Sequence, residues 1–273
     1  MKIKGITISR ENPLIMGILN ATPDSFYNKG RESSLAELEL NAMNMIANGA
    51  TILDIGGQST RPKAEMISAE KELERVLPII KAIHSKFPST ILSIDTFRSE
   101  VAEKCLDAGA DIINDISGGE LDPKIIDIAI QYKVPYICMH MQGTPETMQI
   151  NPHYENVSLE VFQYLNQKIN WMNDKGLEDI ILDLGFGFGK TISHNYQLLN
   201  QLSLFLDLGK PLLAGLSRKS MIYKPLGTDA QQALNGTTAL NMIALQNGAS
   251  ILRVHDVKEA KEVVTLYQQL LMN

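Results

Sequence analysis

Short apolar runs alternate with longer stretches of helical periodicity along the whole chain. The runs are continuous rather than alternating, which is typical of parallel strands that are buried on both faces. Eight such strands are predicted, at Leu14–Leu19, Ile52–Ile55, Ile91–Ile94, Asp111–Ile113, Pro135–Met139, Ile180–Leu182, Leu212–Leu216 and Ile251–Val254.

The segments between these runs predict amphipathic helices. The clearest helix is predicted over Ser68–Lys86, and Pro78 is expected to kink it. Its apolar face contains Leu73, Val76, Leu77, Ile80 and Ile83. A second helix is predicted over Glu155–Lys175. Its apolar face contains Leu159, Phe162, Ile169 and Met172. A last helix is predicted from Asp256, where Glu259 three residues on indicates a capping box.

This order of elements favours a single (β/α)8 TIM barrel domain over residues 1–273. The eight strand–helix units are regular, and no Pro/Ser-rich linker or charge block divides them. A doubly wound open sheet is the alternative, but eight units of this regularity favour closure. In a closed barrel, the active site is expected at the C-terminal ends of the strands.

Composition narrows the classes of partner. The net charge of −6 argues against nucleic acid or an anionic membrane as the main partner. Cys105 and Cys138 lie in apolar stretches and resemble no metal or redox motif, so two reduced, buried thiols are predicted. The N-terminus lacks a signal-peptide pattern, and no apolar run is long enough to span a membrane. A cytoplasmic location is therefore expected.

Polar residues gather where the predicted strands end. They are Asn20, Arg61, Asp95, Asn114, His140, Asp183, Lys219, Arg253 and His255. A single Asp after a strand is more often a helix cap, but capping alone does not explain eight such ends. Carboxylates and an amide suit a neutral heterocycle rich in hydrogen-bond donors. Arginine and histidine suit a phosphate or pyrophosphate, which predicts a site with two halves.

The segment Asp183–Thr191 is rich in glycine but is not a nucleotide motif. Only three residues separate Gly185 from Gly189, whereas a P-loop needs four, and Lys190 stands where a dinucleotide fingerprint needs its third glycine. We expect the backbone around Gly187 to approach a flat ligand closely. Phe188 and Met139 could pack against such a ligand, and a loop anchor is the alternative for Phe188.

The remaining candidates leave two interpretations open. No two histidines have a zinc-site spacing, so a zinc site is not expected. His255 follows Arg253 by two residues, and an anion-binding role and a structural role are both open. For Ser217 and Ser220, helix capping and an anion held at a helix N-terminus are both open.

Taken together, the motifs resemble those of the dihydropteroate synthases over essentially the whole chain. The matching segments occur in family order and are Met16–Phe26, Asp54–Pro62, Asp95, Asn114–Gly119, Met139–Pro145, Gly185–Lys190, Ser217–Ser220 and Arg253–Asp256. Any one of these motifs would be weak evidence, whereas jointly they are highly specific.

The resemblance implies an Mg²⁺-dependent, usually homodimeric transferase of folate synthesis. Such enzymes join 6-hydroxymethyl-7,8-dihydropterin pyrophosphate to p-aminobenzoate, which gives 7,8-dihydropteroate and pyrophosphate. Sulfonamides would be expected to compete for the p-aminobenzoate site.

The matching motifs also imply a role for individual residues, with Lys219, Arg61 and Asp95 as the expected catalytic residues. The pterin would be held by Asp95, Asn114, Asp183 and Lys219, with Met139 lining its pocket. Asn20 would contact Mg²⁺ beside the pyrophosphate. Phosphate oxygens would be bound by Arg61, Arg253 and His255. The p-aminobenzoate site would be shaped by Thr60, Pro62, Phe188, Lys219 and Ser220, next to the loop that contains Gly187.

Several positions depart from the family pattern. Asn28 stands where many members carry an acid, Gln58 where Glu is usual, Lys63 where Gly is usual and Leu184 where Pro is typical. These changes concern loop dynamics and turnover more than the class of substrate.

Two alternatives remain open. A pterin-binding methyltransferase domain would share the barrel and the pterin residues, but it would not need Ser217–Ser220 or Arg61-Pro62. A non-catalytic pterin-binding paralogue should have lost phosphate-site or amine-site residues, whereas this chain keeps Arg61, Lys219 and Arg253.

Overall fold

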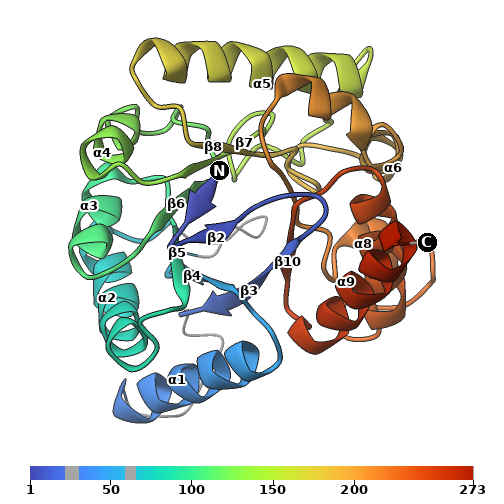
Figure 1. Cartoon of the computed structure of the whole chain (residues 1–273). Helices are drawn as coiled ribbons and strands as arrows, with labels where there is room; N and C mark the ends of the chain where they lie inside the picture. The colour runs from blue at the N-terminus through green and yellow to red at the C-terminus, as the bar shows by residue number, and fades with distance from the viewer. Residues whose placement is uncertain (22–30, 59–65, 273) are drawn as a thin grey trace.

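Eight parallel strands close into a barrel in the computed structural model, which describes residues 1–21, 31–58 and 66–272 (Figure 1). Around the barrel the order is β10-β3-β4-β5-β6-β7-β8-β9. The strands are β3 (Leu14–Asn20), β4 (Ile52–Gly56), β5 (Ile91–Asp95), β6 (Ile112–Asp115), β7 (Tyr136–Met139), β8 (Ile180–Asp183), β9 (Leu212–Ala214) and β10 (Ile251–Val254). The predicted (β/α)8 barrel is confirmed. That residues 1–273 act as one domain stays a prediction.

The helices form an outer ring around these strands (Figure 1). The long ones are α1 (Arg31–Ala47), α2 (Ala69–Lys86), α3 (Ser99–Asp107), α4 (Lys124–Tyr132), α5 (Val157–Asp174), α6 (Ile192–Asn200), α8 (Leu234–Gln246) and α9 (Val257–Met272). A short helix α7 (Ser220–Tyr223) and a 3₁₀ helix η2 (Leu202–Leu208) are also present. The main apolar core lies between this ring and the outward-facing side chains of the strands.

A second apolar cluster fills the inside of the barrel. Each strand contributes inward-facing side chains to it, namely Leu14, Met16, Ile52, Ile91, Ile112, Ile137, Ile181, Leu213 and Ile251. Successive residues of a strand point to opposite faces, so every second residue after these also faces the interior. Those next positions are largely polar, and they form the site described below.

An N-terminal hairpin, not predicted from the sequence, packs against this inner cluster. Strands β1 (Lys2–Ile3) and β2 (Ile6–Thr7) pair antiparallel, and they cross the barrel in the foreground of Figure 1. Lys4 and Gly5 form its two-residue turn with φ of 46° and 80°, as a tight hairpin requires. Ile3 and Ile8 pack in the inner cluster, so the hairpin caps the end of the barrel opposite the polar residues.

The helix predictions are confirmed in part. Helix α2 begins after Ser68, whose side chain accepts a hydrogen bond from Lys71 N, and it continues through Pro78. Helix α5 begins after Asn156, two residues later than predicted. Leu159 does not lie on the buried face, because its residue surface is 49% exposed. The buried stripe of α5 instead contains Val157, Ser158, Val161, Leu165, Ile169 and Met172.

Three further expectations bear on the site less directly. Both carboxylate oxygens of Asp256 accept hydrogen bonds from Arg218, so the capping box proposed for α9 stays a prediction. Cys105 and Cys138 are free and buried, as predicted. Within the described ranges, no helix combines the length and apolar character needed to cross a membrane.

Candidate active site

The polar end of the barrel interior is built by strand alternation. Two residues after the inward-facing apolar layer along each chain segment, the positions that face the interior are Asp54, Ser93, Asn114, Met139, Asp183, Gly215 and Arg253. Two residues later again, they are Asn20, Gly56 and Asp95. In the strand register, Asn20 pairs with Gly56, Gly56 with Asp95, and Asp95 with Asn114. The strands therefore end in one row of polar side chains.

Several strands were predicted one residue too short, because their last residue is polar. Asn20, Asp95 and Asp183 are the last residues of their strands, whereas the hydrophobic pattern stops one residue earlier. The β-ladder is formed by backbone groups, and it continues across a polar side chain that faces the site. Strand β9 differs in the other direction, because it ends at Ala214 rather than Leu216.

Arg253 connects its own strand, β10, to β4 and β5. Its Nε donates to Asp54 Oδ2 at 2.6 Å, and its Nη2 donates to Asp95 Oδ2 at 2.7 Å. Burial alone would lower the pKa of Arg253, but the carboxylates of Asp54 and Asp95 raise it above its usual value. Arg253, the residue expected to bind phosphate, is thus held between two carboxylates at the inner wall of the site.

The ionisation of the Asp95 carboxyl group is finely balanced. Burial raises the pKa of Asp95 to about 7, although the Arg253 guanidinium opposes the rise and the nearby Asp54 adds to it. Since this pKa lies close to neutral pH, small changes in the surroundings of Asp95 alter its charge.

Asp54 was not predicted as a site residue, and it organises two residues that were. Its Oδ2 accepts from Arg253 and also from Asn114 Nδ2, at 3.0 Å. A carboxylate can only accept, so Asp54 takes the NH₂ end of the Asn114 amide and leaves Oδ1 as the atom that Asn114 can offer a ligand. The sequence signal was a charged residue within an otherwise apolar, buried strand.

Lys219 follows β9, the strand that pairs with β10, which carries Arg253. Its Nζ donates to Phe186 O and lies 5.0 Å from the centre of the Phe188 ring. Burial and the positive charge of Arg253 lower the pKa of Lys219 to about 8, although Asp183 opposes this change. Burial likewise raises the pKa of Asp183 despite the attraction of Lys219. The two residues therefore form a polar pair on the β8–β9 side of the mouth.

The glycine-rich loop lies very close to neighbouring protein groups, and its approach to a flat ligand stays a prediction. Gly185 has a φ of 67°, and a Cβ there would lie 1.9 Å from His140 O. Gly187 has a φ of 84°, and a Cβ there would lie 3.3 Å from Lys219 Cδ. Asp183 Oδ1 accepts from Gly185 N at 2.8 Å, so the loop also orients Asp183. The glycines let the loop pack directly on the site residues.

His140 was expected at the mouth, and this expectation is wrong. Strand alternation points Met139 inward and His140 the other way, where it is 6% exposed and packs edge-on against the Tyr164 ring. Burial, and secondarily the charge of Lys190, lowers the pKa of His140 to about 2. Its partner Lys190 is another residue that was not predicted.

The β9 and β10 ends bring Ser217 and His255 together. Ser217 Oγ lies 2.9 Å from His255 Nδ1 and accepts from His255 N at 3.2 Å. Ser217 therefore orients His255, and it does not cap a helix. Lys219 occupies the N-cap position of α7 and makes no side-chain capping bond, and Ser220 is the first residue of that four-residue helix.

Comparison with known proteins decides which family has this arrangement. Residues 16–255 match the sequence model of the family described as pterin binding enzymes. The dihydropteroate synthase of Haemophilus influenzae is 45% identical over 258 residues, which cover 94% of this chain and 93% of that protein. This chain belongs to the dihydropteroate synthase family.

Solved structures of dihydropteroate synthases share the fold. The Yersinia pestis enzyme with a sulfonamide drug complex has a TM-score of 0.93 and 39% identity, and the match covers 100% of this chain and 99% of that one. The Xanthomonas albilineans enzyme with 4-aminobenzoic acid has a TM-score of 0.91 and 37% identity, with 98% and 97% covered. The resemblance noted from the motifs is confirmed.

Part of the dihydropteroate synthase pattern lies outside the described residues. This applies to Thr60, Arg61 and Pro62, and to the unusual positions Asn28 and Lys63. Asn20 is described, and it is exposed at the end of β3. Among the described side chains, no group of three or more His, Cys, Asp or Glu residues could hold a metal ion.

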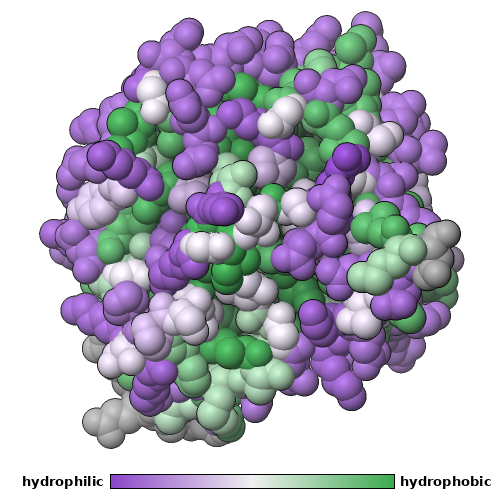
Figure 2. All heavy atoms as spheres, viewed as in Figure 1, coloured by the Kyte–Doolittle hydropathy of each residue, from purple (hydrophilic) through white to green (hydrophobic). Residues whose placement is uncertain are grey.

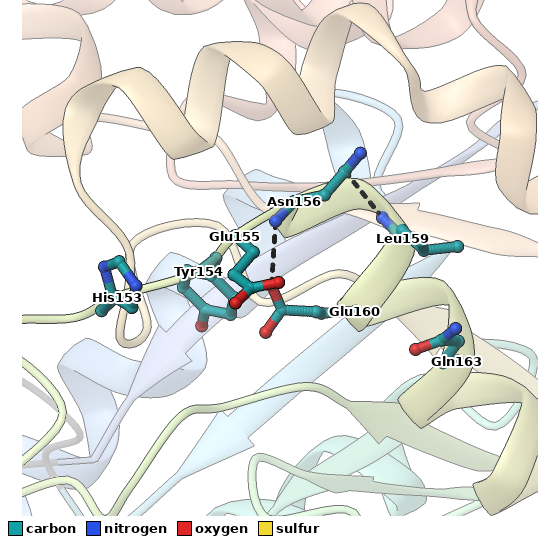
Figure 3. Close-up of a pocket in the computed structure, with 7 residues that line it drawn as sticks. All are labelled: His153, Tyr154, Glu155, Asn156, Leu159, Glu160 and Gln163. Carbon is teal, nitrogen blue, oxygen red and sulfur yellow. Dashed lines mark hydrogen bonds between the residues drawn. The ribbon is translucent and has the colours of Figure 1, made fainter.

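A separate surface pocket of about 370 Å³ lies at the start of α5, along residues 153–163 (Figure 3). Its polar groups serve the helix: Asn156 Oδ1 accepts from Leu159 N, and Asn156 N donates to Glu160 Oε1. Tyr154 in its wall donates a 2.8 Å hydrogen bond to Gly189 O. The strand-end side chains do not line this pocket, and the Tyr154 bond connects its wall to the glycine-rich loop.

Proposed function

We propose that this chain is a dihydropteroate synthase, a transferase that joins 6-hydroxymethyl-7,8-dihydropterin pyrophosphate to p-aminobenzoate. The observation that carries this proposal is the set of acceptors formed by Asp95, Asn114 and Asp183 beside Lys219 at the end of the barrel. A pterin presents an amino group and ring N–H groups along one edge, and these donors need such acceptors. The Haemophilus influenzae relative is named dihydropteroate synthase, which agrees with the chemistry of the site.

The pyrophosphate half of the substrate is proposed to lie on the β10 side. Arg253 and His255 are there, and Arg61 is proposed to join them. Arg253 binds Asp54 through Nε and Asp95 through Nη2, so its planar fork has further N–H groups that suit a phosphate oxygen. The arginine cations favour departure of the negatively charged leaving group.

Mg²⁺ is proposed as the metal of this reaction, held by Asn20 and by oxygens of the pyrophosphate. Mg²⁺ usually keeps several waters and takes only one or two protein oxygens in addition to substrate phosphates. The exposed amide of Asn20 at the end of β3 is a hard oxygen donor of that kind, so the residue fits. The bound ion would supply positive charge for the leaving pyrophosphate.

The reaction is proposed to begin with cleavage of the C–O bond. Both electrons of this bond leave with pyrophosphate, and the ionised carboxylates of Asp95 and Asp183 stabilise the positive charge that develops on the pterin. The neutral aromatic amine then forms the new C–N bond and releases a proton to water. No strong general base is required, because the amine is already neutral.

The aromatic amine is proposed to bind between Lys219 and Phe188, with Ser220 at the start of α7 and with Thr60 and Pro62. Lys219 supplies a cation for the carboxylate of p-aminobenzoate, and Phe188 supplies a ring face next to it. The Xanthomonas albilineans relative was solved with 4-aminobenzoic acid and the Yersinia pestis relative with a sulfonamide drug complex. We therefore expect sulfonamides to compete with p-aminobenzoate in this protein.

The decisive experiment combines the protein with the pterin pyrophosphate, Mg²⁺ and p-aminobenzoate. We expect dihydropteroate and pyrophosphate to form in equal amounts. Pterin binding without release of pyrophosphate would instead support the non-catalytic paralogue. Positional exchange of an ¹⁸O label in the bridge of the substrate, measured without amine, tests whether C–O cleavage comes first. Absence of exchange in a protein that makes dihydropteroate once the amine is added would contradict that order.

A homodimer is proposed on the basis of helix α9. Its residues Leu266, Leu270 and Met272 are 61%, 60% and 75% exposed. In the view of Figure 2, hydrophobic atoms are visible on the right-hand side of the molecule, where Figure 1 shows the end of α9. A second copy that covers such side chains would remove apolar surface from water. Sedimentation should give a dimer that Leu270→Glu weakens. A cytoplasmic location is proposed too, in keeping with two free, buried thiols.

A further inference from the structure

Lys190 is a buried lysine whose side chain turns back into its own loop. The residue is 3% exposed. Its Nζ donates to Phe188 O at 2.9 Å, Gly185 O at 3.0 Å and His140 O at 3.3 Å, and lies 2.9 Å from His140 Nδ1. All four contacts are to backbone carbonyls or a neutral ring nitrogen, and none is to a carboxylate.

This arrangement compensates for a weakness of the loop that it joins. Gly185, Gly187 and Gly189 all have positive φ, and glycine-rich backbone loses more conformational entropy on ordering than other sequences do. Residues 184–190 contain no helix or strand that could supply backbone partners. Lys190 donates to two carbonyls of this loop and to the carbonyl of His140, which directly follows β7, so a single side chain connects the loop to β7.

The other face of the same loop determines the surroundings of Lys219. Phe186 O accepts from Lys219 Nζ, and the Phe188 ring lies 5.0 Å from it. The backbone at Gly187 lies directly against the Lys219 stem. The loop contacts of Lys219 therefore come from residues 186–188. Lys190 holds this segment at both ends, because it binds the carbonyls of Gly185 and Phe188.

We propose that Lys190 is a positioning residue: by holding the carbonyls of Gly185, Phe188 and His140, it fixes the loop that places Lys219 and the Phe188 ring at the aromatic-amine site. This inference rests on the proposed function for its kinetic consequences. Lys190 does not touch the reacting atoms, and it acts through the loop alone.

The test variant is Lys190→Met, which keeps the length of the side chain and removes its donors. We expect KM for p-aminobenzoate to rise and kcat to fall, together by about 10- to 100-fold, because small displacements of catalytic groups have effects of this size. KM for the pterin pyrophosphate should change less. In the ligand-free protein, hydrogen–deuterium exchange should increase in residues 184–190. Lys190→Arg, which keeps the donors, should recover part of both effects.

The matched control is Lys4→Met. Lys4 also binds backbone carbonyls, those of Pro88 and Thr90, but at the opposite end of the barrel. We expect this variant to lower stability and leave both KM values unchanged. If Lys190→Met behaves like Lys4→Met, the role of Lys190 is structural only and the proposal is wrong.

Two further outcomes keep the test decisive. If Lys190→Met does not fold, His140→Phe removes one partner of Nζ and should produce the same pattern in a milder form; unchanged exchange in the loop would overturn the proposal. If the wild-type protein makes no dihydropteroate, the proposed function fails. The exchange measurement would still decide whether Lys190 holds the loop.

Discussion

Asn114 donates a 3.0 Å hydrogen bond from Nδ2 to Oδ2 of Asp54, across the strand that separates them in the barrel. The bond sets the direction of the Asn114 amide, because Asp54 has no proton to donate when ionised. The same oxygen of Asp54 accepts from Arg253, so one buried carboxylate orients residues proposed for the pterin and for the pyrophosphate. A ligand that offers donors is thus favoured over one that offers acceptors.

Replacing Asp54 by Asn should therefore affect substrate binding and stability together. In Asp54→Asn, the amide can donate as well as accept, and Arg253 loses one of two charged partners. We expect KM for the pterin pyrophosphate to rise roughly tenfold. We expect the free energy of unfolding to fall by about 3 kcal/mol, because a buried charge loses its partner. Steady-state kinetics and urea unfolding measure the two effects.

Asp111→Asn is the control for this substitution. Asp111 is also paired with a cation, since its Oδ2 lies 2.8 Å from Lys4 Nζ, but the pair is outside the proposed site. This variant should lose some stability with an unchanged KM. A loss of stability without any change in KM in Asp54→Asn would contradict the orienting role of Asp54.

The pH dependence of catalysis should reflect Asp95 and Lys219. Because burial raises the pKa of Asp95 to about 7 and lowers the pKa of Lys219 to about 8, kcat/KM should rise with an apparent pKa near 7 and fall near 8. Asp95→Asn should remove the rising limb, and Lys219→Arg should move the falling limb to higher pH. Any limb that both variants retain belongs to the substrate.

Stability should change with pH in the opposite sense from an ordinary ion-paired carboxylate. The pKa of Asp95 is about 7 in the folded state, above its ordinary value of 3.8, so the folded state binds the proton more tightly than the unfolded chain. The contribution of Asp95 is therefore fully present below about pH 4 and is lost as the pH rises towards 7. Unfolding of the wild type and Asp95→Asn across this range should diverge in that direction. Parallel curves would show that the pKa of Asp95 is not raised.

The fold could be predicted from the sequence because burial on both faces of a parallel strand leaves a continuous apolar run. The ring of polar strand ends followed from the same pattern. Two features could not follow from it. Arg253 binds Asp54 and Asp95, which are 199 and 158 residues away in the sequence, and no local pattern specifies such partners. His140 and Lys190 are polar and buried, whereas composition places such residues at the surface.

The close approach of the glycine-rich loop to β7 can be tested with a pair of Gly→Ala variants. Gly185 and Gly209 have nearly the same φ, 67° and 68°, so alanine is strained to a similar degree at both. A Cβ at Gly185 would lie 1.9 Å from His140 O, whereas a Cβ at Gly209 would have nothing within 4 Å. We expect Gly209→Ala to lose about 1 kcal/mol of unfolding free energy and to keep its activity.

Gly185→Ala should lose about 2–4 kcal/mol, because steric overlap adds to the backbone strain. It should also raise KM for both substrates, since Gly185 N donates to Asp183 Oδ1 and the loop contacts Lys219. Chemical denaturation and steady-state kinetics on the two variants provide the comparison. Equal losses of stability at the two positions would show that the loop can move away from His140 at no cost.

Removal of the metal tests the role proposed for Asn20. Chelation of Mg²⁺ should abolish turnover, and added Mg²⁺ should restore it. Asn20→Ala should raise the Mg²⁺ concentration needed for half-maximal activity by about tenfold, since loss of a supporting group commonly weakens metal binding by that factor or more. Calorimetry of pyrophosphate binding with and without Mg²⁺ gives a second measurement that does not depend on turnover. The control is Asn48→Ala, which removes an amide just after α1 that donates to Asn44 O, and it should change neither quantity. An Asn20→Ala protein with an unaltered Mg²⁺ requirement would place the metal on other ligands.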